Sequence, residues 1–137
     1  MAFSQSIIKN PTRSVMSFPK ASGTVYAKGA IIAKDLGSNA TLPATSSTPR
    51  SSVLGVTAEA VAAADARTEI TGFEVFPNDE FLVDSTNNSN DAHYGQRMVL
   101  TNSTTVNNTG TDDAAGLVYQ VGVYGAASDK KLVVKFV

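Results

Sequence analysis

The residues of this chain that could do chemistry are few and scattered. The single histidine, His93, lies in a run of asparagine, aspartate and serine. Hydrolytic and acyl-transfer sites need a nucleophile, a base and a group that orients the base. One histidine in a polar loop does not supply that set, so we interpret His93 as a solvated loop residue. The sequence predicts no catalytic residue and no enzyme.

Carboxylates gather at two places that invite comparison with metal sites. Asp79, Glu80 and Asp84 lie close together within a segment of β type. Along one strand face, residues 80 and 84 are about 13 Å apart, which is too far for sharing one ion. Asp112 and Asp113 lack the glycine and glutamate spacing of a calcium-binding EF-hand loop. The glycine-rich motifs that bind nucleotides are also absent from the sequence. We therefore expect no metal site and no cofactor.

The bulk composition narrows the class of protein. A length of 137 residues fits one domain, and the chain has no cysteine, which excludes disulfides and thiolate sites. The first residues lack the basic and apolar regions of a signal peptide. No apolar run approaches the roughly 20 residues of a membrane helix. We therefore expect no export signal and no membrane partner.

Charge is distributed unevenly along the chain. Residues 1–34 contain five basic residues and no acidic one, whereas the remainder contains six basic and all twelve acidic residues. The whole chain has a net charge of −1. Such asymmetry is typical of a segment that binds a partner, and a merely solvated segment has the same composition.

Residues 1–22 are predicted to form an extended N-terminal arm, ahead of a single β domain over residues 23–137. Pro11 and Pro19 bias the residues before them away from helix. The arm also carries apolar side chains, which must be buried against some other surface. The predicted partner-binding residues are Ile7, Ile8, Lys9, Arg13, Val15, Met16 and Phe18. The alternative is that this segment forms the first strand of the domain's own sheet.

Alternation of apolar and polar residues organises the rest of the chain. Leu54 and Val56 are expected on the strand face opposite to Val53 and Gly55, with the period of two that strands impose. Residues 131–137 alternate in the same way. We expect this last strand to be paired inside a sheet, because a free apolar end would fray.

Turn signals separate these runs. Pro77, Asn78 and Asp79 form a strong one, so the flanking runs are expected to form a hairpin or a corner between strands. Gly72 interrupts a run, where a bulge or a close backbone approach is the usual reason. Residues 59–67 are rich in alanine and predict one short helix or a wide turn. The whole pattern predicts an all-β fold, a small β-barrel or sandwich of eight to ten short antiparallel strands with at most one short helix.

A family resemblance rests on the order of these runs. Residues 24–27 form a short β run that leads into Lys28-Gly-Ala-Ile-Ile-Ala, followed by a loop of threonine and proline and then Val53-Leu-Gly-Val-Thr-Ala-Glu-Ala-Val. This arrangement resembles the small decoration (cement), or head-stabilising, proteins of tailed-bacteriophage capsids, and it covers residues 24–84 by motif. The resemblance implies a non-catalytic β-barrel that binds the outside of the capsid shell and stabilises it.

The resemblance also implies partners and a location. The partners are the major capsid protein and copies of the protein itself, commonly as a homotrimer, and the location is the capsid exterior of the virion after synthesis in the host cytoplasm. The aromatic residues lack an accompanying basic groove, so we expect no nucleic-acid partner.

The alternative function is a head-fibre base or adsorption module, which binds a host surface ligand through polar loops at residues 85–93 and 107–116.

Overall fold

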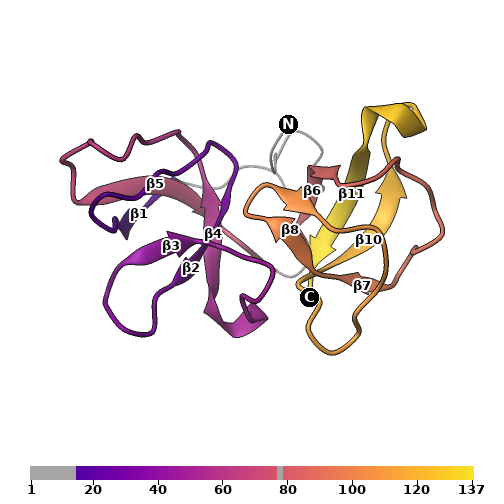
Figure 1. Cartoon of the computed structure of the whole chain (residues 1–137), viewed down its shortest axis with the longest axis horizontal. Helices are drawn as coiled ribbons and strands as arrows, with labels where there is room; N and C mark the ends of the chain where they lie inside the picture. Colours follow the sequence, from indigo (N-terminus) through magenta and orange to yellow (C-terminus); the bar gives the residue numbers. More distant parts are fainter. Residues whose placement is uncertain (1–14, 77–78) are drawn as a thin grey trace.

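The chain folds into two β-sheets, one from each half of the sequence. The structure, a computed structural model, describes residues 15–76 and 79–137. Strands β1 to β5 form the first sheet and strands β6 to β11 form the second, and the two sheets lie side by side (Figure 1). The predicted all-β class is therefore confirmed. Within these two ranges, no helix has the length and apolar character required to cross a membrane.

The first sheet curls into a small, nearly closed barrel. In spatial order its strands are β1 (Met16–Pro19), β5 (Glu69–Glu74), β4 (Val53–Thr57), β2 (Ile31–Lys34) and β3 (Thr41–Pro43). All of these neighbouring pairs are antiparallel. A parallel bridge between Lys20 and Thr41 joins the end of β1 to β3, and the Thr41 hydroxyl donates to the Pro19 carbonyl at 2.7 Å. The two outer strands are thereby linked.

The second sheet also curls back on itself. In spatial order its strands are β7 (Arg97–Met98), β10 (Val118–Val123), β11 (Lys131–Phe136), β6 (Glu80–Ser85), β9 (Thr105–Val106) and β8 (Leu100–Asn102). The pair β6–β9 is parallel and the other pairs of this sheet are antiparallel. Val99 alone separates β7 from β8, so one segment occupies both ends of the sheet. The last strand, β11, is paired on both sides, as its sequence predicts.

Two short 3-10 turns complete the described elements, η2 (Arg50–Ser52) before β4 and η3 (Ala127–Asp129) before β11. The second turn ends at Lys130, which takes a left-handed conformation with φ of 54°. The turn lies between β10 and β11, and its geometry lets the two strands run antiparallel.

One hydrophobic cluster fills the second barrel and continues to the first sheet. Leu132, Val134 and Phe136 of β11 face inward, in the predicted period of two. The rings of Phe81 and Phe136 meet edge to face with centroids 5.4 Å apart. The full cluster is Ile31, Ala44, Val53, Val56, Phe81, Val83, Met98, Leu100, Val106, Leu117, Val118, Leu132, Val134 and Phe136. Because both sheets contribute to it, the two barrels share one core.

A second cluster lies inside the first barrel. It contains Phe18, Tyr26, Ile32, Val61 and Ile70, with Leu54 packed against it. The Phe18 ring lies over two glycines on β4 and β5, since a Cβ added at Gly55 or Gly72 would lie 3.2 Å from that ring. Gly72 therefore marks a close approach of neighbouring groups, one of the two alternatives that its position in a strand predicts.

A bulge in β4 changes which side chains face the shared core. The register of β4 against β2 passes over Leu54. Val53 consequently lies in the shared core together with Val56, while Leu54 packs inside the first barrel. The predicted alternation, with Leu54 and Val56 on one face, is wrong here because an unpaired residue shifts the phase of the strand.

Two alternatives left open by the sequence are resolved. β5 lies in the first sheet and β6 in the second, so these two strands do not pair as a hairpin. Residues 59–67 form turns and no helix, because the main chain of Val61 pairs with that of Tyr26 through hydrogen bonds of 2.8 and 2.9 Å. Hydrogen bonds from Arg67 across this loop lower the pKa of Asp65 to about 2.

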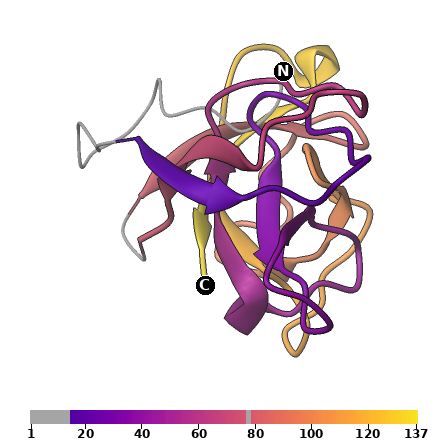
Figure 2. The same cartoon turned by 90° about the vertical axis from the view of Figure 1, so that its left-hand side faces the viewer.

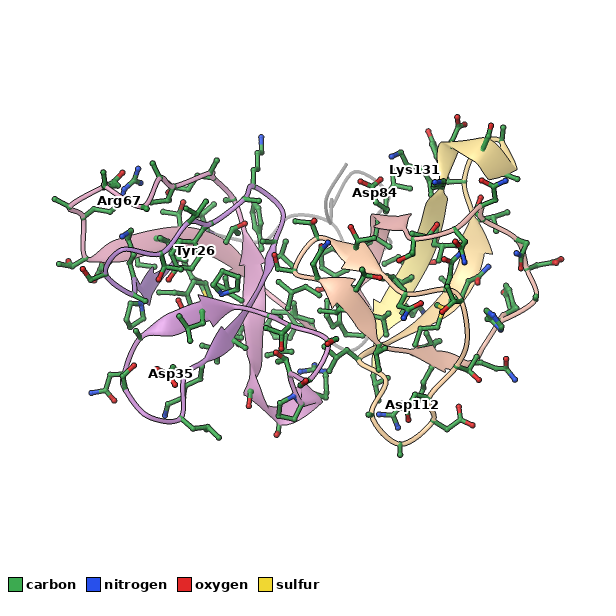
Figure 3. The ribbon with its side chains drawn as sticks, in the orientation of Figure 1. Tyr26, Asp35, Arg67, Asp84, Asp112 and Lys131 are labelled. Atoms are coloured by element: carbon green, nitrogen blue, oxygen red, sulfur yellow. The ribbon has the colours of Figure 1, made fainter. Side chains whose placement is uncertain are left out.

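The Tyr26 hydroxyl links β3 to the segment that follows β1 in the first barrel. It donates to the Thr41 carbonyl at 2.6 Å and accepts the N–H of Ala21 at 3.0 Å (Figure 3). Tyr26→Phe leaves both main-chain groups without that partner, and we expect it to lower the free energy of unfolding by about 1–3 kcal/mol. Urea denaturation measures this change. Tyr94→Phe, at a side chain that is 62% exposed, is the matched control. Equal losses in the two variants would contradict the role of the Tyr26 hydroxyl.

Candidate functional site

The start of β1 is the part of the predicted contact surface that the structure describes. Met16–Pro19 forms a strand of the first sheet, so the alternative of a strand in the domain's own sheet holds for these residues. Val15 and Met16 are 52% and 42% exposed. Phe18 is 7% exposed and packs inside the first barrel, so it is a core residue and we remove it from the contact set. The predicted contacts Ile7, Ile8, Lys9 and Arg13 lie outside the described residues.

β1 also presents an edge of the first sheet. It pairs with β5 along one side, with Met16 opposite Gly72 and Phe18 opposite Ile70. Along its other side, the described part of the chain supplies the bridge at Lys20 and the hydrogen bond from the Thr41 hydroxyl to the Pro19 carbonyl, both at the end of the strand. Figure 2 shows β1, in indigo, at the flank of the first barrel. Main-chain N–H and C=O groups on such an edge can pair with a strand added by another molecule.

The two polar loops of the second barrel are joined by one buried side chain. Asn108 accepts the N–H of Asn87 at 2.8 Å and donates to the carbonyls of Asn87 and Asn88 at 3.2 Å. The loop at residues 85–93 is held again by Gln120, whose amide donates to one of its carbonyls. These contacts give the loops a fixed shape and place them on one polar surface.

The other residues that the sequence analysis considered for catalysis or metal binding do not form a common site. His93 lies half-buried in a turn. Asp84 forms an ion pair with Lys131 across β6 and β11 at 2.5 Å, and this hydrogen bond raises the pKa of Lys131 (Figure 3). Asp112 accepts two N–H groups of its own loop. Among residues 15–76 and 79–137, no group of three histidine, aspartate or glutamate side chains could hold a metal ion.

A polar pocket lies between the loop that precedes β4 and the loop that precedes β10. Its volume is about 280 Å³, and its lining consists of Ser46, Ser47, Thr48, Pro49, Arg50, Arg97, Ala114, Ala115 and Gly116. The lining includes two arginines, one from each half of the chain, and no acidic residue. Sequence reasoning missed this pocket, because Arg50 and Arg97 are far apart in the chain and meet only when both barrels have formed.

Main-chain oxygens hold both arginine side chains in place. Arg97 donates through Nε and Nη2 to the Gly116 carbonyl at 3.2 and 2.8 Å. Arg50 donates through Nε to the main-chain oxygen of Val137 at 2.6 Å, and its guanidinium lies 5.8 Å from the centre of the Phe136 ring. Partial burial lowers the pKa of Arg50, but a guanidinium is still charged at neutral pH.

The described surface thus offers two features that can bind a partner. The edge of β1 is apolar and carries main-chain donors and acceptors, whereas the pocket around Arg50 and Arg97 is cationic. Both features suit recognition of another molecule. Comparison with protein-family models and with curated proteins finds no match to this chain.

Proposed function

We propose that this protein is a non-catalytic structural protein of the virion, which binds the outside of a phage capsid shell and stabilises it. The observation that carries the proposal is the exposed edge of β1, where Val15 and Met16 follow directly on a basic segment without acidic residues. The class of partner comes from the resemblance of residues 24–84 to capsid decoration proteins. The partners are the major capsid protein and further copies of this chain, commonly as a homotrimer.

The physical demands on such a protein agree with the fold. A protein that stabilises a shell must resist deformation, and two curled sheets that share one closely packed core have few ways to deform. Each contact with the shell can be weak, because the symmetry of the shell repeats it over many copies. Linked copies then bind with an avidity above that of a single contact.

The decisive experiment removes the proposed contact without touching the core. A variant that lacks residues 1–14 and carries Val15→Ser and Met16→Ser is expected to co-sediment with empty shells at least about tenfold more weakly. Leu36→Ser is the control, because Leu36 is an apolar residue 85% exposed in the turn between β2 and β3. Phe18 is retained, so the thermal unfolding of the isolated variant should match that of the wild type. Unchanged shell occupancy would exclude the β1 edge from the mechanism.

Shell stability provides the second readout. Bound protein is expected to raise the melting temperature of the shells, since any ligand that binds only the intact state stabilises it. The adsorption alternative relies on the surface formed by residues 85–93 and 107–116, which Asn108 joins. That alternative predicts that the isolated protein binds host cells. Cell binding without any effect on shells would overturn the cementing proposal in its favour.

A further inference from the structure

We propose that the pocket between residues 46–50 and 114–116 binds a tetrahedral oxyanion, either phosphate or sulfate. None of the described residues that line the pocket belongs to β1. The inference therefore stands independently of the capsid role. Three properties of the pocket support it, namely two arginine side chains in its lining, an excess of hydrogen-bond donors and a fixed geometry.

The described side chains that line the pocket include two arginines and no carboxylate. Elsewhere in the described ranges, basic side chains such as Arg67 and Lys131 form ion pairs with carboxylates. Arg97 instead donates to the Gly116 carbonyl, which carries only a partial charge, and Arg50 donates to an oxygen of Val137, the last residue of the printed sequence. Asp112 lies on the same loop, but its carboxylate accepts N–H groups of that loop (Figure 3). Two guanidinium groups on one pocket repel each other, and a bound anion relieves that repulsion.

Hydrogen-bond donors are in excess in the lining. After their bonds to main-chain oxygens, the two guanidinium groups keep most of their Nη hydrogens. The Thr48 hydroxyl accepts the N–H of Thr45 at 2.9 Å, which leaves its hydrogen free to be donated. Ser46 and Ser47 add two more hydroxyls to the lining. Because these donors come from several directions, a tetrahedral anion satisfies more of them than a planar carboxylate does.

The geometry of the pocket is fixed before any ligand binds. A Cβ added at Gly116 would lie 2.7 Å from the Cβ of Arg97 and 2.8 Å from the nitrogen of Met98, so the absent side chain lets these segments approach. The Phe136 ring and the Val137 main chain hold Arg50 on the other side. Less side-chain entropy is therefore lost on binding.

The volume sets the size of the ligand. A water molecule occupies about 30 Å³ of liquid, so a pocket of about 280 Å³ admits an anion together with part of a molecule that carries it. Free phosphate or sulfate and a phosphate group on a larger molecule share the same recognition chemistry. Glucose 6-phosphate compared with inorganic phosphate separates these two sources. Tighter binding of the sugar phosphate would assign the pocket to a carried group.

The test titrates the full chain with sodium phosphate and with sodium sulfate at constant ionic strength, followed by amide NMR shifts. We expect saturating shifts that concentrate at residues 46–50 and 114–116. Arg50→Gln and Arg97→Gln should each weaken binding by about tenfold or more, since each removes charge-assisted hydrogen bonds. Lys28→Gln changes the net charge equally on an exposed turn and should bind as the wild type does.

Three results would overturn the proposal. The first is the absence of saturating shifts at the pocket amides of the wild type, a readout that does not depend on any variant folding. The second is an equal loss of binding in Lys28→Gln, which would indicate general charge screening. The third is tighter binding of acetate than of phosphate at the same amides, which would indicate a carboxylate site.

Ser47→Ala, at an exposed side chain, serves as a further variant, and we expect it to weaken phosphate binding by a few-fold.

Discussion

Replacing Phe18 with alanine is expected to lower the free energy of unfolding by about 3–5 kcal/mol. The side chain is 7% exposed, and its ring lies over Gly55 and Gly72 inside the first barrel. The two glycines have no side chains that could move into the space left by the ring, so the cavity would persist. Denaturation by urea, followed by circular dichroism, measures the loss.

Met16→Ala on the same strand provides the control for this prediction. Met16 is 42% exposed, so its truncation should change the free energy of unfolding by less than about 1 kcal/mol. The pair of variants also separates the two roles of β1, because we expect Phe18 to matter for stability and Met16 for binding. A loss in Phe18→Ala no larger than in Met16→Ala would mean that the ring is not a core element.

The sequence predicts the strands best where the two faces of a strand differ most in polarity. Residues 131–136 alternate lysine or valine with apolar side chains, and the structure buries the predicted set, Leu132, Val134 and Phe136. The period alone does not reveal a bulge, which is why Leu54 faces the opposite side from the one expected. A bulge depends on the pairing of two strands, and that pairing is a property of the fold.

The role of β1 is harder to predict, because the residues around it in the sequence are of the types expected in an extended arm. Basic residues and two prolines surround it, yet Pro19 is compatible with a strand because it lies at the end of an edge strand. The sequence indicates the burial of Phe18 only indirectly. Gly55 and Gly72 lack side chains and so leave room for the Phe18 ring, but that these two glycines lie close together is known only from the register of β4 and β5.

The pocket leaves no signal in the sequence at all. Arg50 and Arg97 each stand among residues of other kinds, and each is anchored by a main-chain oxygen that any residue type can supply. Only the shared core of the two barrels brings their loops together. A site of this kind depends on tertiary structure, so a search for motifs along the chain does not find it.

Replacing Phe136 with alanine is expected to destabilise both barrels in a single transition, by about 3–5 kcal/mol. Phe136 is 1% exposed and belongs to β11 of the second barrel, where it contacts the ring of Phe81. The same cluster includes Ile31 and Val56 of the first sheet, so a cavity at Phe136 weakens packing that both sheets use. Small domains with one core usually unfold in one cooperative step.

Hydrogen exchange of the amides in β4 and β11 tests this coupling directly, because it reports the free energy of opening for each strand. Both strands should lose protection by the same free energy in Phe136→Ala. Val123→Ala on β10, at a side chain that is 46% exposed, should leave protection in both strands within about 0.5 kcal/mol of the wild type. If protection fell in β11 and persisted in β4, the two barrels would be independent folding units, and the rigidity that the proposed capsid-stabilising role requires would have to come from another contact.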